Sequence, residues 1–186
     1  MHGYTGNAQI HASEQQQTEA FFWSLGPFDK VDGWAKRLQD LYAYWRTLPR
    51  NTLAGVPLRS NFDPFAVRSA IGWLWLCDVE GTPLRLRYRL VGTSIVQTVR
   101  ADATGKWMDE LSNSYANRSV DMSRFEATIQ NREATYSKGP PVFDPSNFID
   151  AVEVLCLPVS QNGTVIDQLM CCSAYYRDGR NVPLGN

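Results

Sequence analysis

A strict alternation of charged and apolar residues at positions 84–90 constrains the fold of this chain more than any other feature. Arginine fills every second position, in the order Leu84, Arg85, Leu86, Arg87, Tyr88, Arg89 and Leu90. A two-residue period is typical of a β-strand with one apolar and one cationic face. A second strand is predicted over residues 73–79, and the turn formers of residues 80–83 connect the two. Together these segments predict a β-hairpin.

A second hairpin is predicted near the end of the chain. Residues 151–159 and 165–176 are rich in apolar side chains, and Asn162-Gly163 lies between them. Asn-Gly is the strongest short-range signal for a hairpin turn. Both faces of these strands are apolar, so the sheet needs a cover on each side.

Periodicity predicts a helix ahead of the first hairpin. Residues 34–48 carry apolar side chains at three- and four-residue spacing, which indicates an amphipathic helix, and Pro49 follows where that helix would end. Asp63 is expected to cap a short helix whose first turn contains Pro64.

Between the hairpins the pattern becomes helical again. A short helix is predicted at residues 107–111 and a long one over residues 119–136. Val142-Phe143 would pair only briefly as an edge strand, because prolines precede it. These helices are expected to cover one face of the sheet. The N-terminal helix or a partner subunit would cover the other.

Length and charge limit the organisation and the partners. The chain has 186 residues, which suits one domain, and a net charge of −1 gives no field that would attract nucleic acid or an anionic membrane. No apolar run approaches the roughly 20 residues that span a bilayer, and no signal-peptide pattern is present. We therefore expect a cytoplasmic protein with a mobile segment at 1–33, a domain at 34–178 and a tail at 179–186.

The reactive side chains argue against several kinds of chemistry. All four cysteines fall in apolar strand segments, where we interpret them as small core residues: Cys77, Cys156, Cys171 and Cys172. His2 and His11 are the only histidines and lie in a polar N-terminal stretch, so a nucleophile–histidine pair and a histidine-based metal site are not expected. We predict no catalytic and no metal-binding residue.

Four motifs in order resemble a divergent bacterial subfamily of PAS domains. They are Tyr44-Trp45-Arg46-Thr47-Leu48-Pro49, Pro57-Leu58-Arg59-Ser60-Asn61-Phe62-Asp63-Pro64, Leu86-Arg87-Tyr88-Arg89-Leu90-Val91-Gly92-Thr93 and Thr104-Gly105-Lys106. The resemblance covers about Leu38–Tyr176. It implies an α+β fold, with a five-stranded antiparallel sheet and helices between the second and third strands, that senses a small ligand or a redox state and mediates protein contacts.

The resemblance does not identify a cofactor. The Asn-Cys-Arg-Phe-Leu-Gln element of flavin-binding photosensory PAS domains is absent, which disfavours a covalent flavin. Haem-binding PAS sensors carry a histidine on the long helix, and residues 119–136 contain none, which disfavours haem held by histidine. A noncovalent pocket for an unknown small molecule, or no ligand at all, remains.

A pocket would lie between the helices and the inner face of the sheet. Tyr88, Trp107 and Trp75 are candidates to contact a ligand, and Arg59 or Arg89 could bind a carboxylate through two hydrogen bonds. Each also has a structural interpretation: the aromatic residues as core, and Arg89 as the partner of an acidic residue under the N-terminal helix. The leucine–tyrosine face of the arginine-striped strand would line the pocket.

These features favour a stand-alone sensory or regulatory PAS domain that is not an enzyme. It would bind a small molecule noncovalently or a protein partner, and act through protein contacts. A homodimer is predicted through Leu41 and Trp45 of the N-terminal helix. One alternative is a small cofactor-independent isomerase or dehydratase of the cone-shaped α+β type, for which Asp167 is the acidic candidate. Another is a purely structural interaction domain with a filled core.

Overall fold

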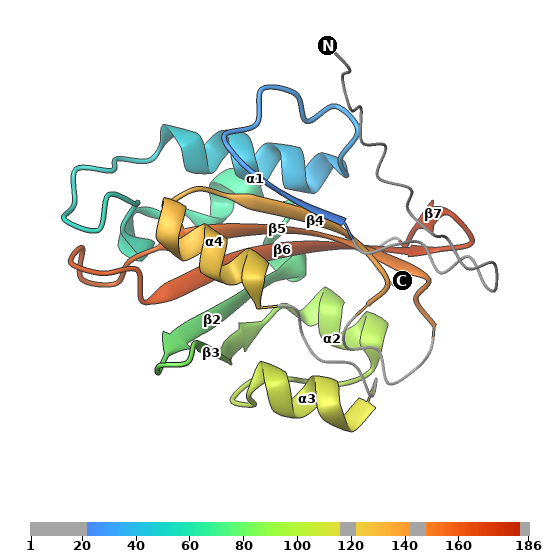
Figure 1. The fold of residues 1–186 in the computed structure, drawn as a ribbon. Coiled ribbons are helices and arrows are strands. Elements are labelled where there is room, and N and C mark those ends of the chain that lie inside the picture. Colours follow the sequence, from blue (N-terminus) through green and yellow to red (C-terminus); the bar gives the residue numbers. More distant parts are fainter. Residues whose placement is uncertain (1–21, 116–121, 142–147, 183–186) are drawn as a thin grey trace, which may run out of the picture.

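The computed structural model describes residues 22–115, 122–141 and 148–182. The strands are β1 (Phe22–Leu25), β2 (Leu74–Glu80), β3 (Arg85–Val91), β4 (Thr135–Gly139), β5 (Ala151–Val159), β6 (Gln168–Arg177) and β7 (Arg180–Asn181). The helices are α1 (Lys36–Thr47), α2 (Thr93–Val99), α3 (Met108–Tyr115) and α4 (Ser123–Asn131), with short 3-10 turns η1 (Arg59–Asn61), η2 (Pro64–Val67) and η3 (Ile71–Trp73). Figure 1 shows a twisted sheet with helices packed against it.

One antiparallel sheet of seven strands forms the centre of the fold. Its order is β1-β4-β5-β6-β2-β3, and β7 pairs with β6. The two hairpins, with helices between them, are arranged as predicted, but the expectation of five strands is wrong. β1 runs beside β4 (Figure 1), within the segment predicted to be mobile, and β7 lies in the predicted tail. Both are short strands whose formation depends on pairing with a distant partner, which local periodicity cannot reveal.

The arginine-striped strand is β3, and its alternation is broken by a β-bulge. Leu76 pairs with Leu90 but Cys77 pairs with Tyr88, so Arg89 is the extra residue. The bulge shifts the following side chains to the opposite face. Leu90 is therefore 51% exposed, although the alternation had predicted it on the pocket face. Val91 takes the inward position instead.

The arginine face does not lie under the N-terminal helix, contrary to the prediction. Arg87 pairs with Glu80 at 2.8 Å and Arg89 with Asp78 at 3.5 Å, while Arg85 reaches Asp109 of α3 at 2.9 Å. The predicted pairing of Arg89 with an acidic side chain is present. Because all three arginine side chains are between 39% and 50% exposed, we expect each pair to contribute little to stability.

Helix α1 packs against β5 and β6 on the face opposite to α2, α3 and α4 (Figure 1). The Trp45 indole N–H donates to the carbonyl of Pro158 at 3.3 Å, and Leu41 and Trp45 are 0% and 1% exposed. The predicted use of Leu41 and Trp45 as a dimer surface is therefore wrong, because the chain's own sheet buries both side chains, while the homodimer itself stays a prediction.

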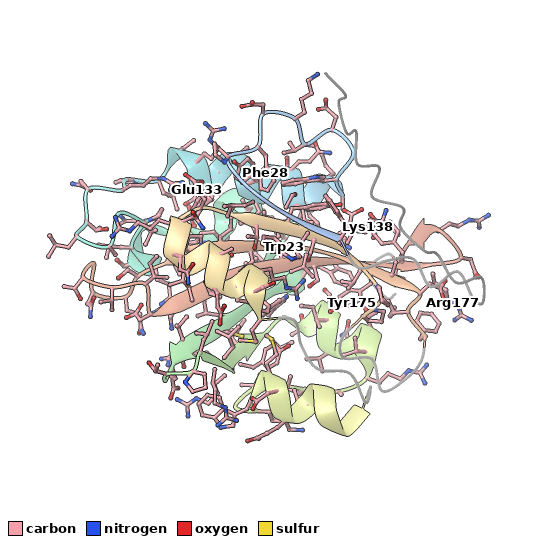
Figure 2. All side chains as sticks on the ribbon, in the orientation of Figure 1. Trp23, Phe28, Glu133, Lys138, Tyr175 and Arg177 are labelled. Atoms are coloured by element: carbon pink, nitrogen blue, oxygen red, sulfur yellow. The ribbon has the colours of Figure 1, made fainter. Side chains whose placement is uncertain are left out.

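The segment between β1 and α1 adds an aromatic cluster to the same face. Phe28, labelled beside α1 in Figure 2, packs edge-on against Trp34 and Tyr42 at centroid distances of 4.9 and 5.6 Å. Trp34 stacks on Tyr136 of β4 at 4.3 Å. Structured packing thus begins well ahead of residue 34, where the domain was predicted to start.

Helix α4 is shorter than the long helix predicted over residues 119–136. It ends at Asn131, the following Arg132 has a left-handed φ of 58°, and Thr135 already belongs to β4. β4 pairs along its whole length with β5, and this long-range pairing overrides the helical pattern. Residues 119–121 and the predicted edge strand Val142-Phe143 lie outside the described residues.

Two local predictions are confirmed. The Asp63 carboxylate accepts a hydrogen bond of 2.9 Å from the Phe65 amide, so it caps η2, a 3-10 turn rather than the longer helix expected there. All four cysteines are free and buried, as expected of core residues.

Candidate ligand pocket

A cavity lies between the inner face of the sheet and helices α2, α3 and α4. It offers about 70 Å³ to the centres of water-sized spheres. One water needs roughly 10–15 Å³ on this measure, so the cavity has room for about five waters or a compact organic molecule. Its walls are formed by Trp75, Tyr88, Val91, Ile95, Val99, Ala101, Ala103, Met108, Arg124, Pro140, Pro141, Val152, Val154, Ser173 and Tyr175.

Strand alternation explains why the sheet presents these residues to the cavity. Val152 and Val154 are two apart on β5, as are Ser173 and Tyr175 on β6, so each pair points to the same face. Tyr175 is labelled in Figure 2 where β6 faces α2. Apolar side chains from the helices close the opposite wall. The cavity is therefore mostly apolar.

Three polar groups from different elements reach this apolar space. Arg124, from the first turn of α4, is 6% exposed as a residue, and its guanidinium donates from Nη1 to Ser137 Oγ at 2.5 Å. Trp75 Nε1 donates to Ser173 Oγ at 2.9 Å. Tyr88 contributes a phenol whose ring lies 5.5 Å from that of Trp75. The cavity thus combines a cation with hydroxyl groups.

Burial controls the ionisation of the nearby acids. It raises the pKa of Tyr88 well above its ordinary value, while the positive charge of Arg124 acts in the opposite direction. Tyr88 is therefore a neutral phenol at physiological pH, able to donate and to accept a hydrogen bond. Burial likewise raises the pKa of the Cys77 and Cys171 thiols, which makes both poor nucleophiles.

Of the predicted ligand contacts, Tyr88 and Trp75 line the cavity and Trp107 does not. Trp107 forms an isolated antiparallel bridge with Arg87 along the free edge of β3, which places it on the arginine side. Its ring lies 4.1 Å from the Arg85 guanidinium and 5.5 Å from that of Arg87. Trp107 therefore does not line the cavity as predicted, because edge pairing with β3 sets its direction.

The predicted arginine anchors also lie elsewhere. Arg59 is exposed in η1, where its amide donates to the Ser160 carbonyl at 2.8 Å, and Arg89 pairs with Asp78 on the outer face. Neither lines the cavity. Asp167 is likewise not a cavity residue, and its Oδ1 accepts from the Gln161 amide at 2.9 Å in the turn.

Sequence reasoning missed Arg124, the cationic side chain that does line the cavity. One signal could have found it: Arg124 and Thr128 are four residues apart beside the apolar stripe of α4. The structure turns both toward β4, where Thr128 Oγ1 is 2.8 Å from Thr135 Oγ1 and Arg124 reaches Ser137. Two polar residues at i and i+4 lie on the same side of a helix. When they border its apolar stripe, as Arg124 and Thr128 do, they indicate that this side packs on a partly polar strand.

Within the described residues, no group of three or more His, Cys, Asp or Glu side chains is arranged to hold a metal ion. His2 and His11 lie outside those residues. No described helix has the length and apolar character needed to cross a membrane.

The chain was compared with models of known protein families. The family model described as "PAS domain" matches residues 35–169, from the start of α1 to the first residues of β6. This range covers more than half of the chain and contains every cavity residue except Ser173 and Tyr175. No curated protein and no solved structure matches the chain.

Proposed function

This chain belongs to the PAS-domain family, and from this premise we propose that it is a sensory or regulatory module that binds a small molecule noncovalently and passes the signal to a protein partner. The cavity between the inner sheet face and α2, α3 and α4 supports the proposal. Mostly apolar clefts and cavities with a few convergent polar groups are typical of small-molecule sites.

Binding is favoured over catalysis by the composition of the cavity wall. Among its described residues there is no Asp, Glu, His or Lys. An isomerase or dehydratase of this size would need an acid or base with a pKa near the working pH. The pKa of Tyr88 moves away from that range, since burial raises it.

A route for the signal runs through β5 to α1. Val152 and Val154 line the cavity, and Glu153 between them points to the other face. There the Glu153 carboxylate accepts from the Ala35 amide at 2.9 Å, at the start of α1. A ligand that moves β5 would therefore change how α1 is held. The module can transmit only the difference in ligand affinity between its two states.

Native mass spectrometry of freshly purified protein tests the proposal, with a cavity-filling variant as comparison. We expect the wild-type protein to carry a noncovalently bound small molecule. Val154→Phe should lose this molecule, because the larger side chain occupies the cavity. Val165→Phe is the matched control, since Val165 is 56% exposed and lies outside the cavity.

The proposal fails if the wild-type protein carries no bound mass and gains no thermal stability from any member of a small-molecule library. It also fails if Val154→Phe and Val165→Phe retain the bound molecule equally. The first result would favour a structural interaction domain, and the second would place the ligand elsewhere.

A further inference from the structure

Tyr88 brings to the cavity a hydroxyl group that forms no hydrogen bond with the described part of the chain. Burial raises the pKa of this phenol well above its ordinary value, so the proton stays on the oxygen. The hydroxyl oxygen is nevertheless not fully enclosed by protein atoms. Because Tyr88 lines the cavity, this proton is available to a ligand there.

Ser173 brings a second hydroxyl proton to the wall, from β6. The residue is 2% exposed, and its Oγ accepts from Trp75 Nε1 at 2.9 Å. An indole N–H can only donate, so the Ser173 proton points elsewhere, and no described residue accepts it. A hydroxyl group that accepts one hydrogen bond becomes a better donor for another. Hydroxyl groups buried this deeply are expected to be hydrogen-bonded, so an acceptor belongs beside Ser173.

The two hydroxyl groups come from the strands on either side of one aromatic ring. β6, β2 and β3 are neighbours in the sheet, and Trp75 lies on β2, the middle strand. Its ring centroid is 5.5 Å from that of Tyr88. Aliphatic side chains such as Ile95 and Val152 form other parts of the wall. The cavity thus offers two donors on a mostly apolar surface.

Such a surface suits a neutral ligand whose polar part is an acceptor. An ion would lose its hydration shell in this space, and two hydroxyl groups do not replace that shell. Arg124 assigns no charge to the ligand, because its guanidinium is already engaged by Ser137 and by the Phe125 ring. A carbonyl oxygen has two lone pairs and no proton, so it accepts from a hydroxyl group without needing an acceptor in return. An alcohol brings a proton of its own, which does need one.

Resting on the proposed ligand-binding function, we propose that the cavity binds a compact neutral carbonyl compound, such as a small ketone or lactone, with the Tyr88 hydroxyl as its principal hydrogen-bond donor. Ser173 is the second donor on the wall, and the apolar part of the ligand contacts the Trp75 ring and the aliphatic side chains. An analogue without an acceptor leaves these donors unpaired, so the site selects by hydrogen bonding as well as by shape.

The experiment compares three probes with the same number of heavy atoms: cyclopentanone, cyclopentanol and methylenecyclopentane. Each is titrated into the wild-type protein and into Tyr88→Phe, and binding is followed by two-dimensional NMR. Tyr88→Phe keeps the ring and removes only the hydroxyl group. We expect it to weaken cyclopentanone binding by about twofold to tenfold, the range of one neutral hydrogen bond, and to leave methylenecyclopentane binding unchanged. In the wild-type protein, where no variant has to fold, cyclopentanone should bind more tightly than cyclopentanol.

Tyr42→Phe is the matched control. The Tyr42 hydroxyl accepts from the Phe28 amide at 2.9 Å on the other side of the sheet, so its removal should lower the urea midpoint of unfolding and leave cyclopentanone binding unchanged. Tyr88→Phe should do the reverse and unfold at the wild-type midpoint, because the Tyr88 hydroxyl has no partner among the described residues. Wild-type binding of cyclopentanone by Tyr88→Phe, or a loss of stability as large as that of Tyr42→Phe, would overturn the proposal.

The remaining outcomes separate this proposal from the proposed function. Equal or tighter binding of cyclopentanol, or a co-purified molecule that is charged or lacks a carbonyl group, overturns the neutral carbonyl ligand and leaves a ligand-binding module. Absence of binding by all three probes, together with no molecule carried by the purified protein, overturns both. A co-purified neutral carbonyl compound that Tyr88→Phe retains less well supports both.

Discussion

Glu153 provides the sharpest test of how α1 is held on the sheet. It is 1% exposed, and its two carboxylate oxygens accept hydrogen bonds of 2.9 Å from the Ala35 amide and the Tyr176 hydroxyl. Lys138 Nζ lies 3.6 Å from the same carboxylate, with its side chain 46% exposed. We predict that Glu153→Met destabilises the protein more than Glu153→Gln, and that both variants loosen α1.

The magnitudes follow from what each replacement can accept. Methionine leaves the Ala35 N–H and the Tyr176 O–H without their acceptor, at about 1–3 kcal/mol each. Because the desolvation cost of the buried carboxylate disappears as well, the net loss should be about 3 kcal/mol. Glutamine can still accept from Ala35, and its amide group can donate to the Tyr176 oxygen. Only the assistance of the charge is lost, about 1 kcal/mol.

Urea unfolding followed by circular dichroism measures the free energy of unfolding, and hydrogen exchange at the Ala35 amide and the first turn of α1 measures local opening. Glu126→Gln, an exposed carboxylate on α4, is the control and should change stability by less than about 0.5 kcal/mol. The reasoning is refuted if Glu153→Met unfolds with the wild-type free energy, or if α1 exchanges no faster in either variant.

Two further predictions concern the first hairpin and the turn after it. Gly92→Ala should lower the free energy of unfolding in urea by about 1–3 kcal/mol, because a Cβ there would clash with the carbonyl group of Gly72. Gly33→Ala is the control and should be close to neutral, since the space around Gly33 is open. Equal losses of stability in the two variants would contradict the packing argument. Because of the bulge in β3, Val91→Asp should be at least about 2 kcal/mol more destabilising than Leu90→Asp, since only Val91 faces the cavity. Strict alternation would give the opposite order.

Local sequence patterns predicted the elements whose stability depends on their own side chains. The alternation in residues 84–90 and the Asn162-Gly163 turn identified the two hairpins, because period and turn chemistry are local properties. β1 and β4 were missed for the opposite reason. Each is a short strand selected by its partner: β1 pairs with β4, and β4 pairs with β5. A helical pattern that ran to Tyr136 could not compete with that pairing.

The candidate site was predicted less completely than the fold. Tyr88 and Trp75 were found because strand alternation gives a side chain its direction, and both face the cavity. Trp107 was misplaced, because its direction is set by pairing at the edge of β3 rather than by the short helix predicted at residues 107–111. Arg124 was missed because its position on the cavity wall depends on how α4 docks on β4, a tertiary contact of which the spacing of Arg124 and Thr128 is the sole local sign.

The arrangement of β5 suggests how a ligand on one face of the sheet would change the docking of α1 on the other face. Val152 and Val154 touch the cavity, while Glu153 between them holds the start of α1 with a hydrogen bond of 2.9 Å. Such a bond to a charged group contributes about 1.5–3 kcal/mol. A change of 1.4 kcal/mol alters an equilibrium constant tenfold, so a partial loss of this one bond would be enough to change how often α1 leaves the sheet. Undocking would expose Leu41 and Trp45, which the folded protein keeps buried. On this reasoning a ligand that alters hydrogen exchange in β5 should also alter it in α1, and Glu153→Met should raise exchange in α1 without any ligand.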